Sequence, residues 1–223
     1  MGIAERKLRE KSQRRKAILK AAKRLILKHG VEGMSMNQLA RATELNKATL
    51  YLYFSEKDDL VDAVAYEGLL LLEKAFQEVN RFALRGFEKV SRLVHTTFSF
   101  YGQYPVYFHA FNHQERRRPS ERLETPFAVK GNEVASRIFD RIAEGIRQGI
   151  DDGSIRKEID INVLLVLLYA QIYGVMHTVH SKKDIYEDVF GLAPAIIEES
   201  ALEIIEYYLR TGERAQGKEQ VIP

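Results

Sequence analysis

Residues 35–54, SMNQLARATELNKATLYLYF, decide the fold of this chain. Ser35 and Gln38 form a capping-box pattern, in which two side chains satisfy the N–H groups exposed at the start of a helix. Asn46 is a favoured N-cap residue, so it predicts the start of a second helix. Ala40 provides the small side chain needed where the two helices cross. The stretch therefore predicts two short helices joined by a tight turn.

Apolar side chains at helical spacing indicate which side of these helices is buried. They are Leu39, Leu45 and Leu50. With those side chains buried, the second helix has an outward face made of Asn46, Lys47, Thr49 and Tyr51. Such side chains can reach phosphates and base edges when a helix enters the major groove of DNA. The pattern favours a helix-turn-helix that reads DNA, and its alternative is a pair of packed helices in an ordinary bundle.

The charge distribution points in the same direction. Residues 1–60 contain 14 Lys or Arg and 7 Asp or Glu, whereas the remainder contains 20 and 24. A basic head on a mildly acidic body indicates that the head meets a polyanion and that the body has another role. A solvated basic terminus is the alternative interpretation.

The composition narrows the class of protein. Apolar residues make up 45% and charged residues 29%, the balance of an ordinary globular protein. The sequence contains no cysteine, which excludes disulfides and thiolate metal sites, and a reducing cytoplasm fits. The longest apolar stretch, 163–179, is shorter than the ~20 residues of a membrane span and contains Gln171 and His177, so a buried helix and no membrane are expected.

Helical periodicity runs along the whole chain and predicts an all-α fold. A first helix capped by Ser12 should end at Gly30, and Ser55 with Asp58 predicts the start of a long helix. Further helices are expected over 86–103, 105–113, 127–150, 161–181 and 194–210. The expected organisation is a three-helix DNA-binding domain with a basic arm over 1–57, a helical ligand-binding and dimerisation domain over 58–212, and a polar tail over 213–223.

The run from Asn46 to Phe54, followed by Lys57 and Leu60, closely resembles the signature of the TetR (tetracycline-repressor-like) family. The resemblance is specific over residues 12–60; beyond them it extends only to length and helical character. It implies a homodimer whose two heads bind a double-stranded operator in successive major grooves. It also implies control by a small molecule bound in the body.

Carried over to this sequence, and with two arginines of the arm added, the residues expected to contact DNA are Arg14, Arg15, Ser35, Asn46, Lys47, Thr49, Tyr51, Tyr53 and Lys57. The sequence departs from the family pattern at two positions. Glu44 replaces the usual glycine of the turn, where a left-handed conformation costs roughly 1 kcal/mol. Ala48 replaces a glycine within the second helix, where alanine is better by ~1 kcal/mol.

Two carboxy-terminal segments, 161–181 and 194–210, are too apolar to be lone surface helices. One face of each can pack on its own body while a second face needs a partner, which predicts a homodimer through these helices. The alternative is a pair of helices fully buried within one chain.

The middle of the chain is rich in aromatic residues that suit a cavity for a small hydrophobic or aromatic effector. The expected lining residues are Tyr101, Tyr104, Phe108, Tyr169, Tyr173 and His177. Plain core filling is the alternative for many of them. A further cluster near Pro119 is interpreted as a solvated charged loop, with attraction of an anionic ligand as the alternative; it consists of Arg116, Arg117, Arg118 and Arg122.

No cofactor, metal site or enzymatic activity is expected. The pairs His109/His113 and His177/His180 could each share a helix face, but no HExxH pattern is present. Ring hydrogen bonds within the core or pocket are therefore expected for these histidines, and metal binding is the alternative. GxSxG, Walker, GxGxxG and ExxH di-metal patterns are also absent from the sequence. The leading hypothesis is a ligand-responsive regulator, expected to be a repressor, and the alternative is a constitutive or architectural DNA-binding protein.

Overall fold

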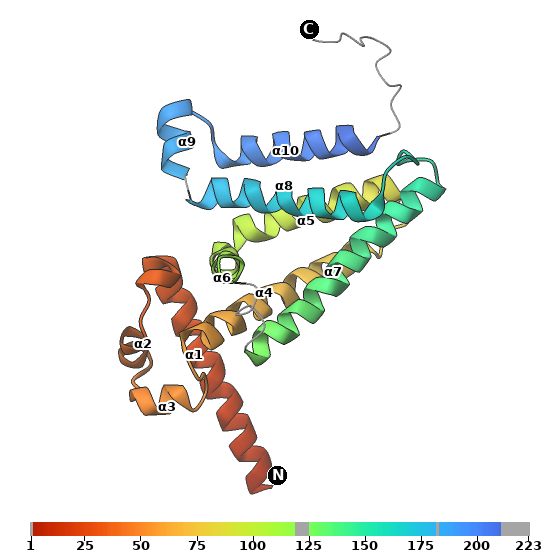
Figure 1. Cartoon of the computed structure of the whole chain (residues 1–223). Helices are drawn as coiled ribbons and strands as arrows, with labels where there is room; N and C mark the ends of the chain where they lie inside the picture. Colours follow the sequence, from red (N-terminus) through yellow and green to blue (C-terminus); the bar gives the residue numbers. More distant parts are fainter. Residues whose placement is uncertain (1, 119–124, 182, 211–223) are drawn as a thin grey trace. The chain divides into compact units, whose positions relative to one another are not determined.

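The computed structural model describes residues 2–118, 125–181 and 183–210, so the expected tail over 213–223 and Arg122 lie outside the described residues. The described part is built of α-helices, with a single isolated bridge between Ile155 and Arg210. This confirms the all-α prediction. The helices, labelled in Figure 1, are α1 Ile3–Gly33, α2 Met36–Thr43, α3 Lys47–Tyr51, α4 Lys57–Val79, α5 Gly86–Gln103, α6 Pro105–Glu115, α7 Pro126–Asp151, α8 Ile161–Ser181, α9 Lys183–Phe190 and α10 Pro194–Leu209.

The helix starts and ends outside α2 and α3 differ in part from the predicted signals. Gly30 interrupts α1 with φ 69°, a value that favours glycine, and one further turn follows it. The cap before α4 differs from the prediction, because the carboxylate that accepts from the Ser55 N–H, at 3.0 Å, is Asp59 rather than Asp58. α1 begins at Ile3, well before the predicted cap at Ser12, and α9 was not predicted.

The chain forms two compact units. The first consists of Met1–Phe76 with Thr97–Ile138, and the second of Gln77–Thr96 with Phe139–Pro223. The first unit therefore contains the α1–α3 head together with α6, and the second contains α8, α9 and α10. This division differs from the expected domain boundary at residue 57, which stays a prediction.

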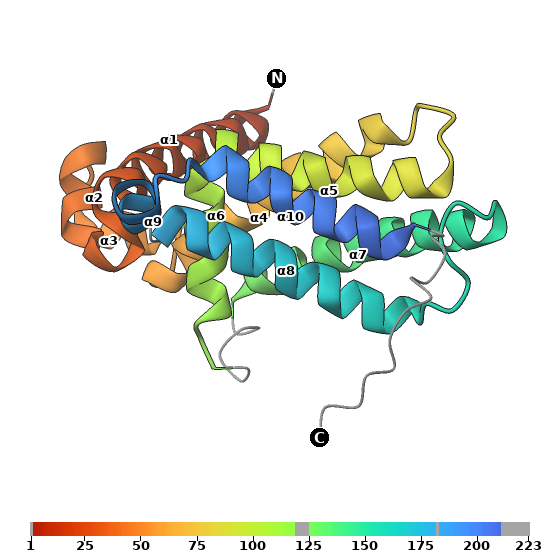
Figure 2. The same cartoon turned by 90° about the horizontal axis from the view of Figure 1, so that it is seen from above.

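In the second unit, α8 and α10 run side by side, as both Figure 1 and Figure 2 show. The prediction of a buried helix over 163–179 is wrong, because α8 buries only one side of itself. Val166 is 66% exposed on α8, and Tyr207 is 84% exposed on α10. Within the described residues, Ile161–His180 is also long and apolar enough, by length and composition alone, to cross a membrane. Among the described residues, several large apolar side chains of these two helices therefore remain exposed.

Candidate nucleic-acid interface

The helix predicted to read DNA is α3, and one side of it is buried in the core of the head. Leu50 is fully buried, as are Leu39 of α2 and Ile18 of α1, so the three helices of the head share one core. Burial of this size contributes about 1.5–3 kcal/mol for each such side chain. Because Leu50 anchors α3 from one side, the opposite side of this helix is held toward solvent.

The outward side of α3 carries the predicted polar residues. Asn46, Lys47 and Tyr51 are exposed, and Thr49 is half-buried. The Asn46 side chain caps the helix, because its oxygen accepts a hydrogen bond from the Thr49 N–H at 2.7 Å. The Lys47 ammonium lies 6.0 Å from the centre of the Tyr51 ring. The structure thus places the residues predicted to contact DNA on one side of α3, with Asn46, Lys47 and Tyr51 exposed.

The turn between α2 and α3 has the left-handed geometry that the family resemblance implies, although Glu44 replaces the usual glycine. Glu44 adopts the left-handed conformation, with φ 55° and ψ 30°, and is the one non-glycine residue with positive φ among the described residues. The cap before α2 is also as predicted, since Ser35 accepts from the Gln38 N–H at 3.2 Å and Gln38 accepts from the Ser35 N–H at 2.8 Å. The strained turn costs roughly 1 kcal/mol, which the packing of both helices offsets.

The remaining residues predicted to contact DNA differ in their exposure and in their contacts within the protein. Arg14 is exposed, but the Arg15 guanidinium lies 4.3 Å from the centre of the Phe127 ring, a cation–π distance. Tyr53 is half-buried and lines a small groove. Lys57 donates from its Nζ to the carbonyl oxygen of Glu32 at 3.3 Å, which ties the start of α4 to the end of α1.

A polar cluster that the sequence did not predict joins α6 to the head. The Lys23 ammonium on α1 lies 2.6 Å from Glu67 on α4 and 3.2 Å from the Tyr107 hydroxyl on α6. Burial lowers the pKa of Lys23, but the hydrogen bonds to Glu67 and Tyr107 outweigh it and leave the pKa raised. The three helices therefore meet at one charged hydrogen-bonded point.

A second polar bridge lies at the other end of α6. The two ring nitrogens of His113 lie 3.2 Å from a Glu32 oxygen on α1 and 3.0 Å from an Asp58 oxygen on α4. Carboxylates only accept hydrogen bonds, so both contacts are satisfied together when the ring carries both protons. Burial raises the pKa of Asp58, but the contacts with His113 and Arg117 outweigh it and hold the pKa below its usual range.

Next to this bridge, Asp62 on α4 is fully buried and accepts three hydrogen bonds. The donors are Arg117 at 2.7 Å, Gln114 at 2.7 Å and Thr125 at 2.6 Å. The Arg117 side chain is only 9% exposed, so its interpretation as part of a solvated loop is wrong. No local pattern could have revealed this, because Arg117 and Asp62 are 55 positions apart in the sequence.

The predicted effector-binding residues fall into two clusters, one in each unit. In the first unit, Tyr101 and Phe108 are buried with their ring centres 5.6 Å apart, and Tyr104 is 42% exposed. Burial raises the pKa of the Tyr101 hydroxyl. In the second unit, Tyr169, Tyr173 and His177 are half-buried and stack successively along α8, with ring centres 6.1 and 6.0 Å apart.

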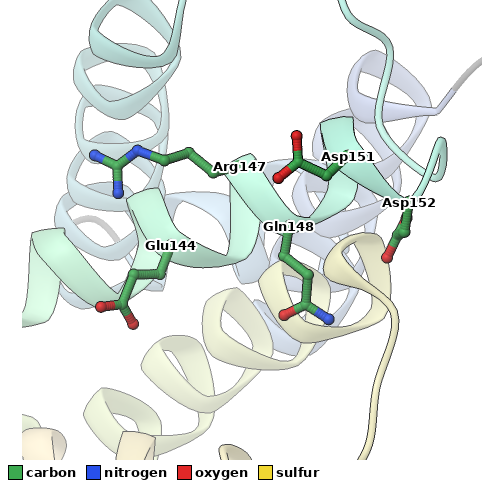
Figure 3. A pocket seen from close by; sticks show the side chains of 5 residues that line it. All are labelled: Glu144, Arg147, Gln148, Asp151 and Asp152. Atoms are coloured by element: carbon green, nitrogen blue, oxygen red, sulfur yellow. The ribbon is translucent and has the colours of Figure 1, made fainter.

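An open depression of about 500 Å³ lies at the carboxy-terminal end of α7 and includes none of those aromatic residues. Figure 3 shows that its side chains spread over different sides of α7 instead of converging. Two of them have structural roles. Gln148 donates to the Leu84 carbonyl at 2.7 Å, and Asp152 accepts from the Gly86 N–H at 2.8 Å. The side chains of this depression therefore connect α7 to the start of α5, and they do not form a ligand site.

Comparisons with known proteins agree with the geometry of the head. Residues 18–64 match the family described as bacterial regulatory proteins, tetR family. A curated relative from Haemophilus influenzae, an uncharacterised HTH-type transcriptional regulator, is 35% identical over 69 residues. That match covers 29% of this chain and 37% of the length of the relative.

Solved structures resemble the chain over almost its whole length. A putative transcriptional regulator from Saccharomonospora viridis in complex with choline has a TM-score of 0.72 and 21% identity, covering 90% of this chain and 100% of its own. FadR from Bacillus subtilis in complex with stearoyl-CoA has a TM-score of 0.68 and 17% identity, covering 87% and 98%. The TetR family regulator PfmR from Thermus thermophilus has a TM-score of 0.64 and 20% identity, covering 88% and 99%. At these identities the likeness shows a shared fold.

Proposed function

The chain belongs to the TetR family of transcriptional regulators, and we propose that it is a repressor released from its operator by a small hydrophobic molecule. The observation that carries the proposal is the exposed polar face of α3, held outward by the buried Leu50. Lys47 and Thr49 would contact the operator from this face, while Tyr53 and Lys57 would contact its phosphates. The proposal places the protein in the cytoplasm, where its DNA target lies.

A homodimer is part of this proposal, because a two-headed reader needs two copies of α3. The exposed apolar faces of α8 and α10 support it, since they leave large side chains such as Val166 and Tyr207 open to water in one chain. Packing against the same faces of a second copy would bury them in a four-helix arrangement. We propose that this pair of helices forms the dimer interface.

The contacts of α6 support control by a ligand. The buried aromatic residues Tyr101 and Phe108 belong to the same compact unit as the head, and Tyr107 and His113 of α6 bridge to α1 and α4. A molecule that displaces α6 would therefore disturb contacts with the helices that support α3. It can induce release only if it binds the displaced state more tightly. The structural neighbours bound to choline and stearoyl-CoA support a small-molecule effector without choosing its chemical class.

The DNA-binding part is tested by selecting bound duplexes from a random pool and measuring affinity by fluorescence anisotropy. Lys47→Ala should weaken binding to the selected duplex roughly 5- to 160-fold, equivalent to about 1–3 kcal/mol. Tyr53→Phe should weaken it less, because it removes one phosphate contact. Lys74→Ala, an exposed lysine of α4, is the matched control and should have little effect. Full affinity in Lys47→Ala, with dimers intact by sedimentation, would contradict the assigned docking.

The effector part is tested with the same duplex and a panel that includes acyl-CoAs, fatty acids and choline. At least one class should lower operator affinity, and the effect should disappear when Tyr101 of the first unit is replaced by alanine. Unchanged affinity across the panel would favour the second candidate, a constitutive DNA-binding protein. An architectural protein would, in addition, bind unrelated duplexes as tightly as the selected one.

A further inference from the structure

The first helix continues far beyond the part of the chain that matches the family. The match begins at residue 18, whereas α1 begins at Ile3. Residues 3–17, here called the α1 extension, therefore form a helix roughly 22 Å long at 1.5 Å per residue. Figure 1 shows α1 continuing past the level of α3 at the same end of the head. The extension thus has the reach to meet whatever α3 contacts.

The α1 extension is strongly basic and open to solvent. It carries seven Lys or Arg and two Glu. From residue 4 to residue 17 every side chain is exposed except the half-buried Arg15. A helix with so few apolar contacts gains little from the protein core, so its own packing does not explain why it is present. A surface of this charge attracts a polyanion.

Two sets of basic residues lie on opposite sides of α1. Lys7, Lys11 and Arg14 are spaced by four and three residues and lead into Ile18 and Ala21, both buried in the head core. These three residues, called the head-side stripe, therefore overhang the side of α1 on which the other head helices pack. A second set, called the outer stripe, lies on the opposite side and consists of Arg9, Lys16 and Lys20.

One residue of the head-side stripe, Lys11, lies in a groove next to the end of α3, the helix expected to read DNA. A groove of about 300 Å³ is lined on the α1 side by Leu8, Lys11, Ser12 and Arg15, and on the other side by Leu52 and Tyr53. Leu52 and Tyr53 directly follow α3. The groove therefore brings the Lys11 ammonium and the Ser12 hydroxyl close to the segment through which α3 is expected to approach DNA. One phosphodiester matches these cationic and hydroxyl groups.

We propose that the α1 extension is a second DNA-binding surface, whose head-side stripe binds the sugar-phosphate backbone beside the base pairs read by α3. This inference rests on the proposed function, and it adds a sequence-independent DNA contact outside the part of the head that matches the family. Each neutralised phosphate releases condensed counterions, so the contact strengthens binding and makes it more sensitive to salt. It also lengthens the stretch of operator that each head protects.

The test uses the full chain and the duplex selected for the wild type, with affinity measured by anisotropy over a range of KCl concentrations. The variant Lys7→Gln/Lys11→Gln/Arg14→Gln should lower the slope of log affinity against log salt by roughly 2–3 for each head, at ~0.9 per lost phosphate contact. The matched control Arg9→Gln/Lys16→Gln/Lys20→Gln removes the same charge from the outer stripe and should lower it by less than half as much. Hydroxyl-radical footprinting should show that only the first variant loses protection at the edge of the site.

Equal slopes in the wild type and both variants would overturn the proposal. An equal decrease of the slope in the two variants would also overturn it, because the loss of positive charge alone would then explain the result. Circular dichroism and thermal unfolding check that each variant keeps its fold. These failures differ from a failure of the proposed function. If the wild type shows no preference among duplexes, the regulator itself is refuted, whereas a selective wild type with indifferent variants refutes only the role of the extension.

Discussion

Replacing Asp62 by asparagine should destabilise the protein strongly, although the side chain keeps its size. Asp62 is fully buried and accepts hydrogen bonds from Arg117, Gln114 and Thr125. Asparagine removes the negative charge and turns an –NH2 group toward groups that are themselves donors. Breaking a buried ion pair in this way costs about 3–5 kcal/mol, because the remaining guanidinium is left buried with less compensation.

For a chain of this length the loss corresponds to a decrease in Tm of roughly 6–20 °C, at about 2–4 °C per kcal/mol. The assay is urea and thermal unfolding followed by circular dichroism, at one fixed protein concentration because assembly would shift the apparent stability. Asp140→Asn, at an exposed position of α7, is the control and should change stability by no more than about 0.5 kcal/mol. Adding Arg117→Met to Asp62→Asn should recover part of the loss, because it removes the buried charge. A loss below about 1 kcal/mol in Asp62→Asn would refute the reasoning from buried charge.

Three further predictions concern packing, pH and assembly. Gly68→Ala should lower stability by about 1–3 kcal/mol in urea unfolding, because its Cβ would lie 2.7 Å from the Tyr107 side chain; unchanged stability would mean that the ring moves aside freely. The pKa of Asp58 is depressed because its contacts with His113 and a neighbouring guanidinium outweigh burial. The stabilising contribution of Asp58 is therefore complete above the ordinary pKa of 3.8, and it is lost as the pH falls through the pKa of the folded state. Asp58→Asn should therefore be less stable than the wild type near neutral pH, and the gap should narrow in acid; a gap independent of pH would contradict this sign. Val166→Glu should shift the protein from dimer to monomer in analytical ultracentrifugation without unfolding it, and an unaltered dimer would place the interface elsewhere.

The amino-acid sequence by itself determined the head, because the forces that define it act within a few residues. The hydroxyl of Ser35 and the amide of Asn46 cap helices through N–H groups three positions away, and Leu50 is buried by helical spacing alone. The left-handed conformation of Glu44 was implied by the family resemblance, because Glu44 stands where the family usually has a glycine in the turn. Local chemistry was therefore sufficient to predict which residues α3 exposes.

Only the tertiary structure decided how the head is joined to the rest of its unit. His113 meets a carboxylate 81 positions earlier, and Arg117 meets one 55 positions earlier. From the sequence, ring hydrogen bonds were expected for His113 but their partners could not be identified, and Arg117 could not be distinguished from a solvated surface charge. A polar side chain shows no local sign of its distant partner. Likewise, the apolar composition of 163–179 indicated burial, but only the arrangement of α8 against α10 showed which side remains open. Caps and periodicity depend on neighbours along the chain, whereas ion pairs and buried faces depend on which distant helices the folded backbone brings together.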